Sequence, residues 1–74
     1  MNYQEQNEVI NKFFDEGCDK IDIPNCASIR EAYEKATNAP GCSSCAKRRA
    51  RSKYTSLVRA IIKERDLKDV LKDQ

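Results

Sequence analysis

The sequence predicts a small all-α protein: three or four helices in one domain, residues 1–74, stapled by a zinc site of four cysteines. Three observations lead to this prediction. Apolar residues recur at helical spacing in three stretches of the chain. Four cysteines occur in a chain without histidine. Seventy-four residues are near the size at which a hydrophobic core alone is marginal, and small proteins then add a metal, disulfides or partners.

The first predicted element is an amphipathic helix over Asn2–Glu16. Gly17 follows it and suits the left-handed backbone position that commonly ends a helix. The helical spacing of the apolar side chains defines a core-facing stripe. Its main members are Val9, Ile10, Phe13 and Phe14.

Residues 18–26 are predicted to form an extended connector or a very short strand. Ile21 and Ile23 alternate with acidic residues, and a following proline pushes Ile23 toward an extended conformation. The connector should loop so that the cysteines at its two ends, Cys18 and Cys26, converge.

A short second helix is expected from Ser28 to about Asn38. Ser28 and Glu31 match the capping-box pattern of a hydroxyl followed three residues later by a carboxylate. The composition of residues 38–41 then indicates a turn.

One long helix is predicted from about Ser44 to Arg65. Its apolar side repeats every 3.6 residues and comprises Ala46, Ala50, Tyr54, Leu57, Val58, Ile61 and Ile62.

Beyond Arg65 the apolar phase slips, which leaves Leu67, Val70 and Leu71 on a different side. Either Asp66 caps a short helix that folds back, or this trio contacts another molecule, including a second copy of the chain. We favour the fold-back, because Asp66 begins a cap-like segment.

The cysteines follow the pattern C-x7-C-x15-C-x2-C, in which C-x-x-C is the commonest way to present two thiolates to a tetrahedral ion. We expect one Zn²⁺ per chain. An iron–sulfur cluster is also compatible with four cysteines, but the ferredoxin spacings are absent. A thioredoxin-like redox pair lacks the preceding strand, and structural disulfides need an oxidising compartment. The predicted zinc ligands are Cys18, Cys26, Cys42 and Cys45.

The long helix is strongly basic. The first 26 residues carry a net charge of −4, whereas residues 46–65 carry +7. Its cations lack acidic partners one turn away, so we favour contact with the phosphate backbone of DNA or RNA over a merely solvated face. An acidic protein surface is a close rival. The candidate contact residues are Lys47, Arg48, Arg49, Arg51, Ser52, Lys53, Ser56, Arg59 and Lys63.

The stretch from Pro40 to Arg49, which reads PGCSSCAKRR, resembles the P-G-C-x-x-C-x-x-R-R stretch of small proteins encoded by tailed bacteriophages. The likeness extends over Pro40–Tyr54. It implies a phage origin and a metal site, and it carries no established activity.

These observations predict a zinc-binding regulatory protein that contacts nucleic acid or the transcription machinery. The alternative is a phage-encoded protein-binding module, either an inhibitor of a host enzyme or a minor virion component. Catalysis is not expected, since a closed four-cysteine site leaves no open coordination position. The chain shows no signal peptide and no membrane-length apolar run. We therefore expect a cytoplasmic location, in an infected bacterium if the phage origin holds.

Overall fold

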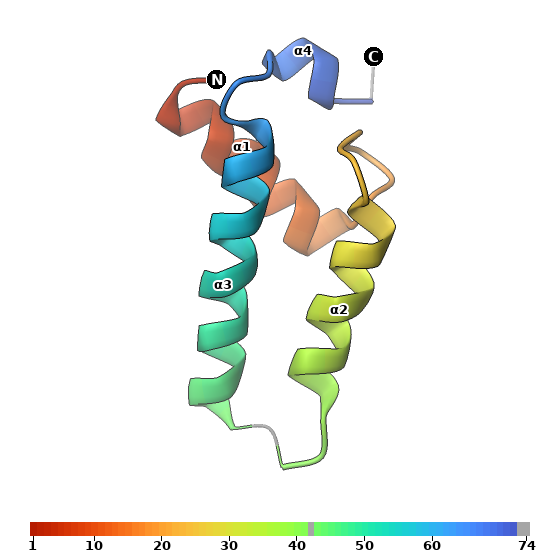
Figure 1. Ribbon diagram of the computed structural model, residues 1–74, viewed down its shortest axis with the longest axis vertical. Coiled ribbons are helices and arrows are strands. Elements are labelled where there is room, and N and C mark those ends of the chain that lie inside the picture. The colour runs from red at the N-terminus through yellow and green to blue at the C-terminus, as the bar shows by residue number, and fades with distance from the viewer. Residues whose placement is uncertain (42, 73–74) are drawn as a thin grey trace.

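The computed structural model describes residues 1–41 and 43–72 and contains four helices in these ranges: α1 Tyr3–Glu16, α2 Cys26–Asn38, α3 Ser44–Ile62 and α4 Leu67–Val70. Helices α2 and α3 lie antiparallel as a long hairpin (Figure 1). Helix α1 crosses one end of this hairpin, and α4 lies beyond the end of α3. The molecule is elongated, with extents of 39 × 21 × 16 Å. The predicted all-α fold is confirmed.

Helix α1 begins and ends almost as the sequence predicts. Asn2 is the N-cap, and its side chain accepts a hydrogen bond from the backbone N–H of Glu5. The Glu5 carboxylate in turn accepts from the N–H of Asn2, which completes a capping box. Gly17 ends the helix with a φ of 70°, a conformation that costs glycine little because it has no Cβ.

The connector between α1 and α2 is free of turns only around residues 21–23, between turns and bends at residues 17–20 and 24–25, and it pairs there with the segment that follows α4. Ile21 forms an isolated antiparallel bridge with Leu71. The N–H of Asp22 donates to the carbonyl of Val70 at 2.6 Å, and the N–H of Lys72 donates to the carbonyl of Lys20 at 2.9 Å. These bonds satisfy backbone groups that would otherwise need water.

Helix α2 starts earlier than the predicted capping box at Ser28. Asn25 is the N-cap, with a left-handed φ of 61°, and its side chain makes no capping hydrogen bond. Ser28 therefore lies inside the first turn and is exposed. The predicted start was therefore wrong. The helix begins directly after the turn at Asn25, and asparagine tolerates the positive φ that this turn requires.

Helix α3 begins where predicted, at Ser44, and its N-cap Ser43 accepts a hydrogen bond from the N–H of Ala46 at 3.2 Å. It ends at Ile62, three residues before the expected Arg65. A turn follows, in which the N–H of Arg65 donates to the carbonyl of Ile62.

The C-terminal apolar trio folds back onto its own chain. Val70 is fully buried, and Leu67 and Leu71 pack against the core as partly buried residues. Asp66 occupies the N-cap position of α4, although its side chain makes no capping hydrogen bond. The favoured fold-back is confirmed.

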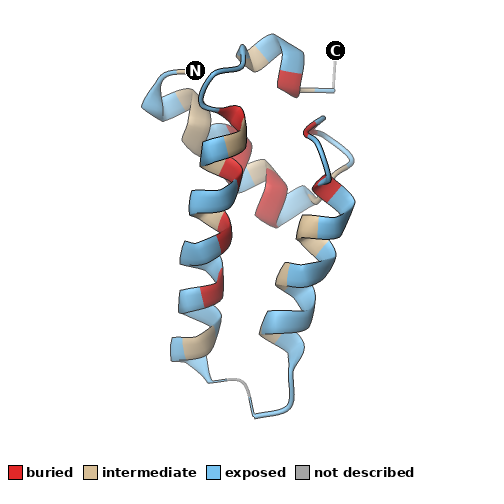
Figure 2. Ribbon diagram, viewed as in Figure 1, coloured by how far each residue is buried: buried red, intermediate tan, exposed pale blue. Residues whose placement is uncertain are grey.

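The core lies where α1 crosses the α2–α3 hairpin. Its largest fully buried side chains are Phe13, Ile21, Ile62, Val9, Val58 and Val70. Figure 2 shows buried residues concentrated at that crossing, and few along the far part of the hairpin. The part of the hairpin that leads to the α2–α3 turn therefore projects from the core with most of its surface exposed.

An edge-to-face aromatic series extends the core along the hairpin. The ring of Phe14 contacts Phe13 and Tyr33, with centroids 5.2 and 4.8 Å away. Tyr33 then contacts Tyr54 at 5.8 Å. These contacts join α1, α2 and α3, and confirm that Phe13 and Phe14 are core residues.

None of the described helices combines the length and the apolar character needed to cross a membrane.

Candidate functional site

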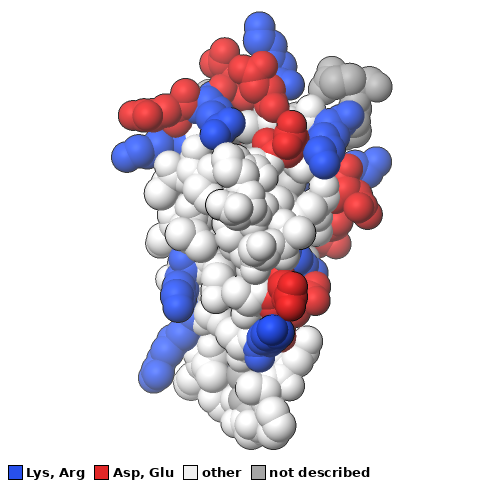
Figure 3. All heavy atoms as spheres, turned by 45° about the vertical axis from the view of Figure 1, so that its right-hand side comes forward, with Lys and Arg blue, Asp and Glu red and all other residues white. Residues whose placement is uncertain are grey.

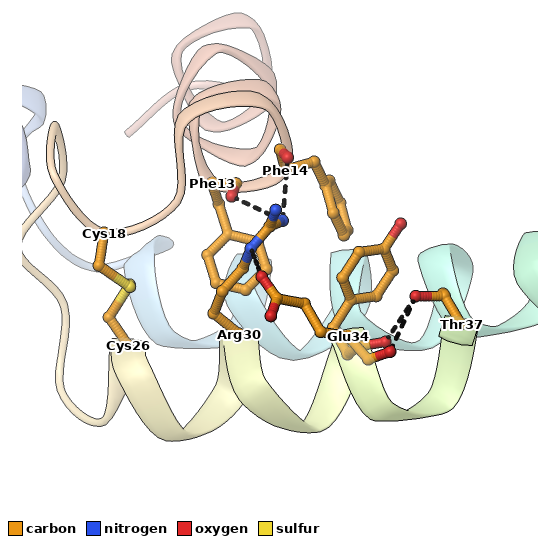
Figure 4. Close-up of polar contacts among 8 residues, drawn as sticks. Phe13, Phe14, Cys18, Cys26, Arg30, Glu34 and Thr37 are labelled. Carbon is orange, nitrogen blue, oxygen red and sulfur yellow. Dashed lines mark hydrogen bonds and ion pairs between the residues drawn. A yellow bond between two sulfur atoms is a disulfide. The ribbon is translucent and has the colours of Figure 1, made fainter. Parts of the chain in front are cut away.

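Two of the four predicted zinc ligands are joined as a disulfide. The Sγ atoms of Cys18 and Cys26 are 2.10 Å apart and their Cα atoms 6.0 Å apart. Figure 4 shows the bond between Cys18, in the connector after α1, and Cys26, the first residue of α2. The two cysteines converge as predicted, but they bind each other. In this state neither sulfur is a thiolate, which is the form that binds metal.

The third described cysteine lies at the other end of the hairpin. Cys45 is a free, exposed thiol in the first turn of α3. Helix α2 has 13 residues and is therefore about 20 Å long. Figure 1 places the starts of α2 and α3 at opposite ends of that length. Cys45 therefore cannot share a tetrahedral ion with Cys26 in this arrangement.

Cys42, the remaining predicted ligand, lies outside the described residues. Within the described ranges, no group of three or more Cys, His, Asp or Glu side chains is arranged to hold a metal ion. The cysteines of this arrangement do not fit one closed four-thiolate site. Zinc binding stays a prediction that requires a reduced and rearranged chain.

The candidate contact residues all lie on α3, except Lys63, which is its C-cap. Helix α3 contains no acidic residue between Ser44 and Ile62. The side chains of Lys47, Arg48, Arg49, Ser52 and Ser56 are exposed. In Figure 3, basic side chains along the lower left edge have no acidic side chains beside them. The acidic groups in that view gather at the top and along the right.

Two of the predicted contact residues, Arg51 and Lys53, make cation–π contacts within the protein. The guanidinium of Arg51 lies over the ring of Phe14, 4.3 Å from its centroid. The ammonium of Lys53 lies 5.5 Å from the ring centroid of Tyr54. Cation–π contacts of this kind are stabilising. The contact of Arg51 joins α3 to α1, whereas Lys53 and Tyr54 are neighbours within α3.

Arg59, another candidate contact residue, is only partly exposed because it contacts α1. Its guanidinium donates to Gln6 Oε1 at 3.0 Å and to Asn7 Oδ1 at 2.9 Å. It also lies 4.6 Å from the ring centroid of Tyr3. Helix α1 covers this part of α3, which the spacing within α3 alone could not reveal.

The exposed part of the basic face on the first half of α3 surrounds a hollow. Cys45, Arg48, Arg49 and Ser52 line it. These positions are three or four residues apart and so lie on one side of the helix. Two long cationic side chains thus flank the small side chains of a cysteine and a serine, and an anion has room to approach the helix there.

Arg30 is a structural residue that the sequence reasoning missed. Its Nη1 donates to the carbonyls of Phe13 and Phe14 at 3.3 and 2.9 Å, and its Nε donates to Glu34 Oε1 at 3.1 Å (Figure 4). The two carbonyls belong to the last turn of α1, which contains no basic residue of its own. Arg30 supplies this missing positive charge from α2.

Comparison of the chain with protein-family models, with curated proteins and with solved structures gave no match.

Proposed function

We propose that the protein binds the phosphate backbone of nucleic acid through the exposed face of α3. The observation that carries this proposal is a row of cations without acidic partners. The ion pairs in the described part of the chain are Lys12–Glu16 within α1, and Arg30–Glu34 and Glu31–Lys35 within α2. None of them includes an α3 side chain, so the positive charge of α3 is available to an external anion.

The chemistry of the hollow fits a phosphate group. Arg48 and Arg49 each offer a planar fork of N–H donors, which matches two phosphate oxygens. Ser52 offers a hydroxyl donor beside them, and Ser56 continues the same face one turn later. Because the serines are small, a phosphate can approach the helix while the long arginine side chains reach around it.

The main rival partner is an acidic protein surface, including a surface of the transcription machinery. Carboxylates would meet the same arginines with the same bidentate geometry. Nucleic acid is favoured because the cations follow one helical face in a row, and a phosphate backbone presents charges at regular intervals. One measurement separates the two partners. If the partner is nucleic acid, the protein should bind random-sequence DNA or RNA at low salt, and added salt should weaken that binding steeply.

The test compares two double variants with equal changes in net charge. Arg48→Gln/Arg49→Gln removes the cations of the hollow, whereas Lys20→Gln/Lys35→Gln removes two exposed cations outside α3. Affinity for labelled DNA and RNA is measured by fluorescence anisotropy over a range of salt concentrations. The arginine variant should bind more weakly, with a salt dependence shallower by about one unit per lost phosphate contact. The lysine variant should bind like the wild type.

Two results would count against the proposal. If the wild type has no affinity for DNA or RNA even at low salt, the row of cations belongs to an acidic protein partner. If both double variants lose affinity equally, binding reflects the net charge of the molecule and not the face of α3.

Zinc binding would add a second property to this function. It requires Cys18 and Cys26 to be reduced and the Cys45 end of the hairpin to approach them. The support for it is the cysteine pattern of the sequence, and a reduced chain is the state in which to look for it.

A further inference from the structure

Tyr3 differs from the other aromatic residues because its ring is exposed. The chain has five aromatic residues. Phe13, Phe14, Tyr33 and Tyr54 form the edge-to-face series of the core. Tyr3 lies outside that series, at the first residue of α1, and is 68% exposed. An aromatic ring left in water is an apolar surface available to a partner.

Arg59 holds a fixed position against this ring. Its guanidinium lies 4.6 Å from the ring centroid of Tyr3, and the hydrogen bonds to Gln6 and Asn7 anchor it to α1. A cation over one face of the ring leaves the remaining ring surface open. The pair therefore combines a flat apolar surface with a positive charge, in a geometry that is formed before any ligand arrives.

The pair lies beside the proposed phosphate-binding face. Arg59 follows Ser52 by seven residues, or about two helical turns, so both residues lie on nearly the same side of α3. From Arg48 to Arg59 the helix rises by about 16 Å. A nucleic acid strand bound at Arg48 and Arg49 can follow α3 over this length and reach Tyr3.

We infer that Tyr3 and Arg59 form a platform on which one nucleobase stacks, so that the partner is single-stranded DNA or RNA. This inference rests on the proposed function of α3. Bases of a duplex are stacked on each other and cannot offer a free face, whereas a single strand can turn a base outward. Stacking of bases on aromatic side chains beside a positive groove is the common mode of single-strand binding.

The test uses Tyr3→Ala, Tyr3→Phe and Leu57→Ala. Within residues 1–41 and 43–72, Leu57 is the other large apolar residue that is exposed, at 42%, and it lies on the other flank of α3. Each variant is titrated with a thymidine single strand of about 12 nucleotides, within the usual site size, and with a mixed-sequence duplex. Circular dichroism and thermal melting check that each variant is folded.

Tyr3→Ala should weaken single-strand binding about five- to tenfold, as the loss of one base stack does at the low end of its range. Its duplex affinity and its salt dependence should not change, because no phosphate contact is removed. Tyr3→Phe should bind like the wild type, since the ring is kept, and so should Leu57→Ala. The wild type should prefer the single strand to the duplex.

The outcomes separate this inference from the proposed function. If Tyr3→Ala binds the single strand as tightly as the wild type while Arg48→Gln/Arg49→Gln does not, the platform is wrong and the phosphate face stands. If the wild type binds duplex and single strand equally, the inferred partner is wrong. If it binds neither, both proposals fail.

Discussion

Arg59 shows how one side chain can serve the fold and the surface together. Its two hydrogen bonds to Gln6 and Asn7 join α1 to α3 on the side away from α2, and its charge still lies at the edge of the basic face. Arginine suits this position because its planar fork donates to two acceptors at once. Lysine, with one compact ammonium, would not hold both amides in this geometry.

At the residue scale, Arg59→Gln should lower the free energy of unfolding by about 1–3 kcal/mol, because hydrogen bonds from a charged donor are lost at a half-buried site. Arg48→Gln, on the exposed face, should change it by less than about 0.5 kcal/mol. Urea unfolding followed by circular dichroism measures both. Equal stability of the two variants would mean that the contacts of Arg59 with α1 contribute nothing to the fold.

The short helix α4 depends on its contacts with the rest of the chain. Four residues are far too few for a helix that is stable by itself. Val70 anchors α4 in the core, and the backbone bonds of the connector to Val70 and Lys72 hold the segment from the other side. The connector and the C-terminal segment thus stabilise each other.

At the element scale, Val70→Asp should lower the free energy of unfolding by about 3 kcal/mol or more, because it places a charge at a fully buried position. Lys68→Gln changes the charge by the same amount at an exposed position of α4 and should have little effect. Thermal melting at several protein concentrations, with light scattering, checks the result. A melting temperature unchanged by Val70→Asp, together with a reduced apparent mass, would show that Val70 serves association between copies instead.

The helices could be predicted because apolar spacing within one segment decides which side is buried. The periodic residues Val9, Phe13, Ala50, Tyr54 and Val58 are indeed buried. What the spacing could not give is the position of one helix against another. The contacts of Arg59 with α1 and those of Arg30 with the end of α1 depend on that position.

The start of α2 shows another limit of local patterns. The capping box at Ser28 is a real signal for a helix start, yet the helix begins at Cys26. Asn25 accepts a left-handed backbone, and Cys26 is tied to Cys18. A disulfide to a residue eight positions earlier and a turn thus accompany a helix start that the local preference did not predict.

For the molecule as a whole, the sequence left open how the cysteines are used. A thiol can form a disulfide or bind a metal with the same side chain, and the choice depends on the redox conditions. The prediction of zinc assumed a reducing cytosol. The Cys18–Cys26 bond is instead the oxidised alternative, and it closes the connector that contacts the C-terminal segment.

If this disulfide is the staple of the fold, Cys18→Ser/Cys26→Ser should lower the free energy of unfolding by about 2–3 kcal/mol, the value expected for a short closed loop. Reduction of the wild type should have the same effect. Hydrogen exchange should then rise at the backbone amides of Asp22 and Lys72, because these N–H groups donate to the carbonyls of Val70 and Lys20 and their bonds depend on the closed connector. The matched control is Cys45→Ser, which removes an exposed free thiol and should leave stability unchanged.

A strong chelator and a reductant, applied separately, distinguish the disulfide from zinc as the staple. If the disulfide holds the molecule, the oxidised protein keeps its helical circular dichroism with the chelator and loses stability with the reductant. If a four-thiolate zinc site holds it, elemental analysis of protein purified under reducing conditions finds about one zinc per chain, and the chelator alone melts the helices. Metal binding of this kind contributes about 10 kcal/mol or more, which exceeds the stability of a typical small domain. Cys45→Ser then becomes decisive: it should destabilise a zinc-bound protein severely, whereas the disulfide-closed protein should tolerate it.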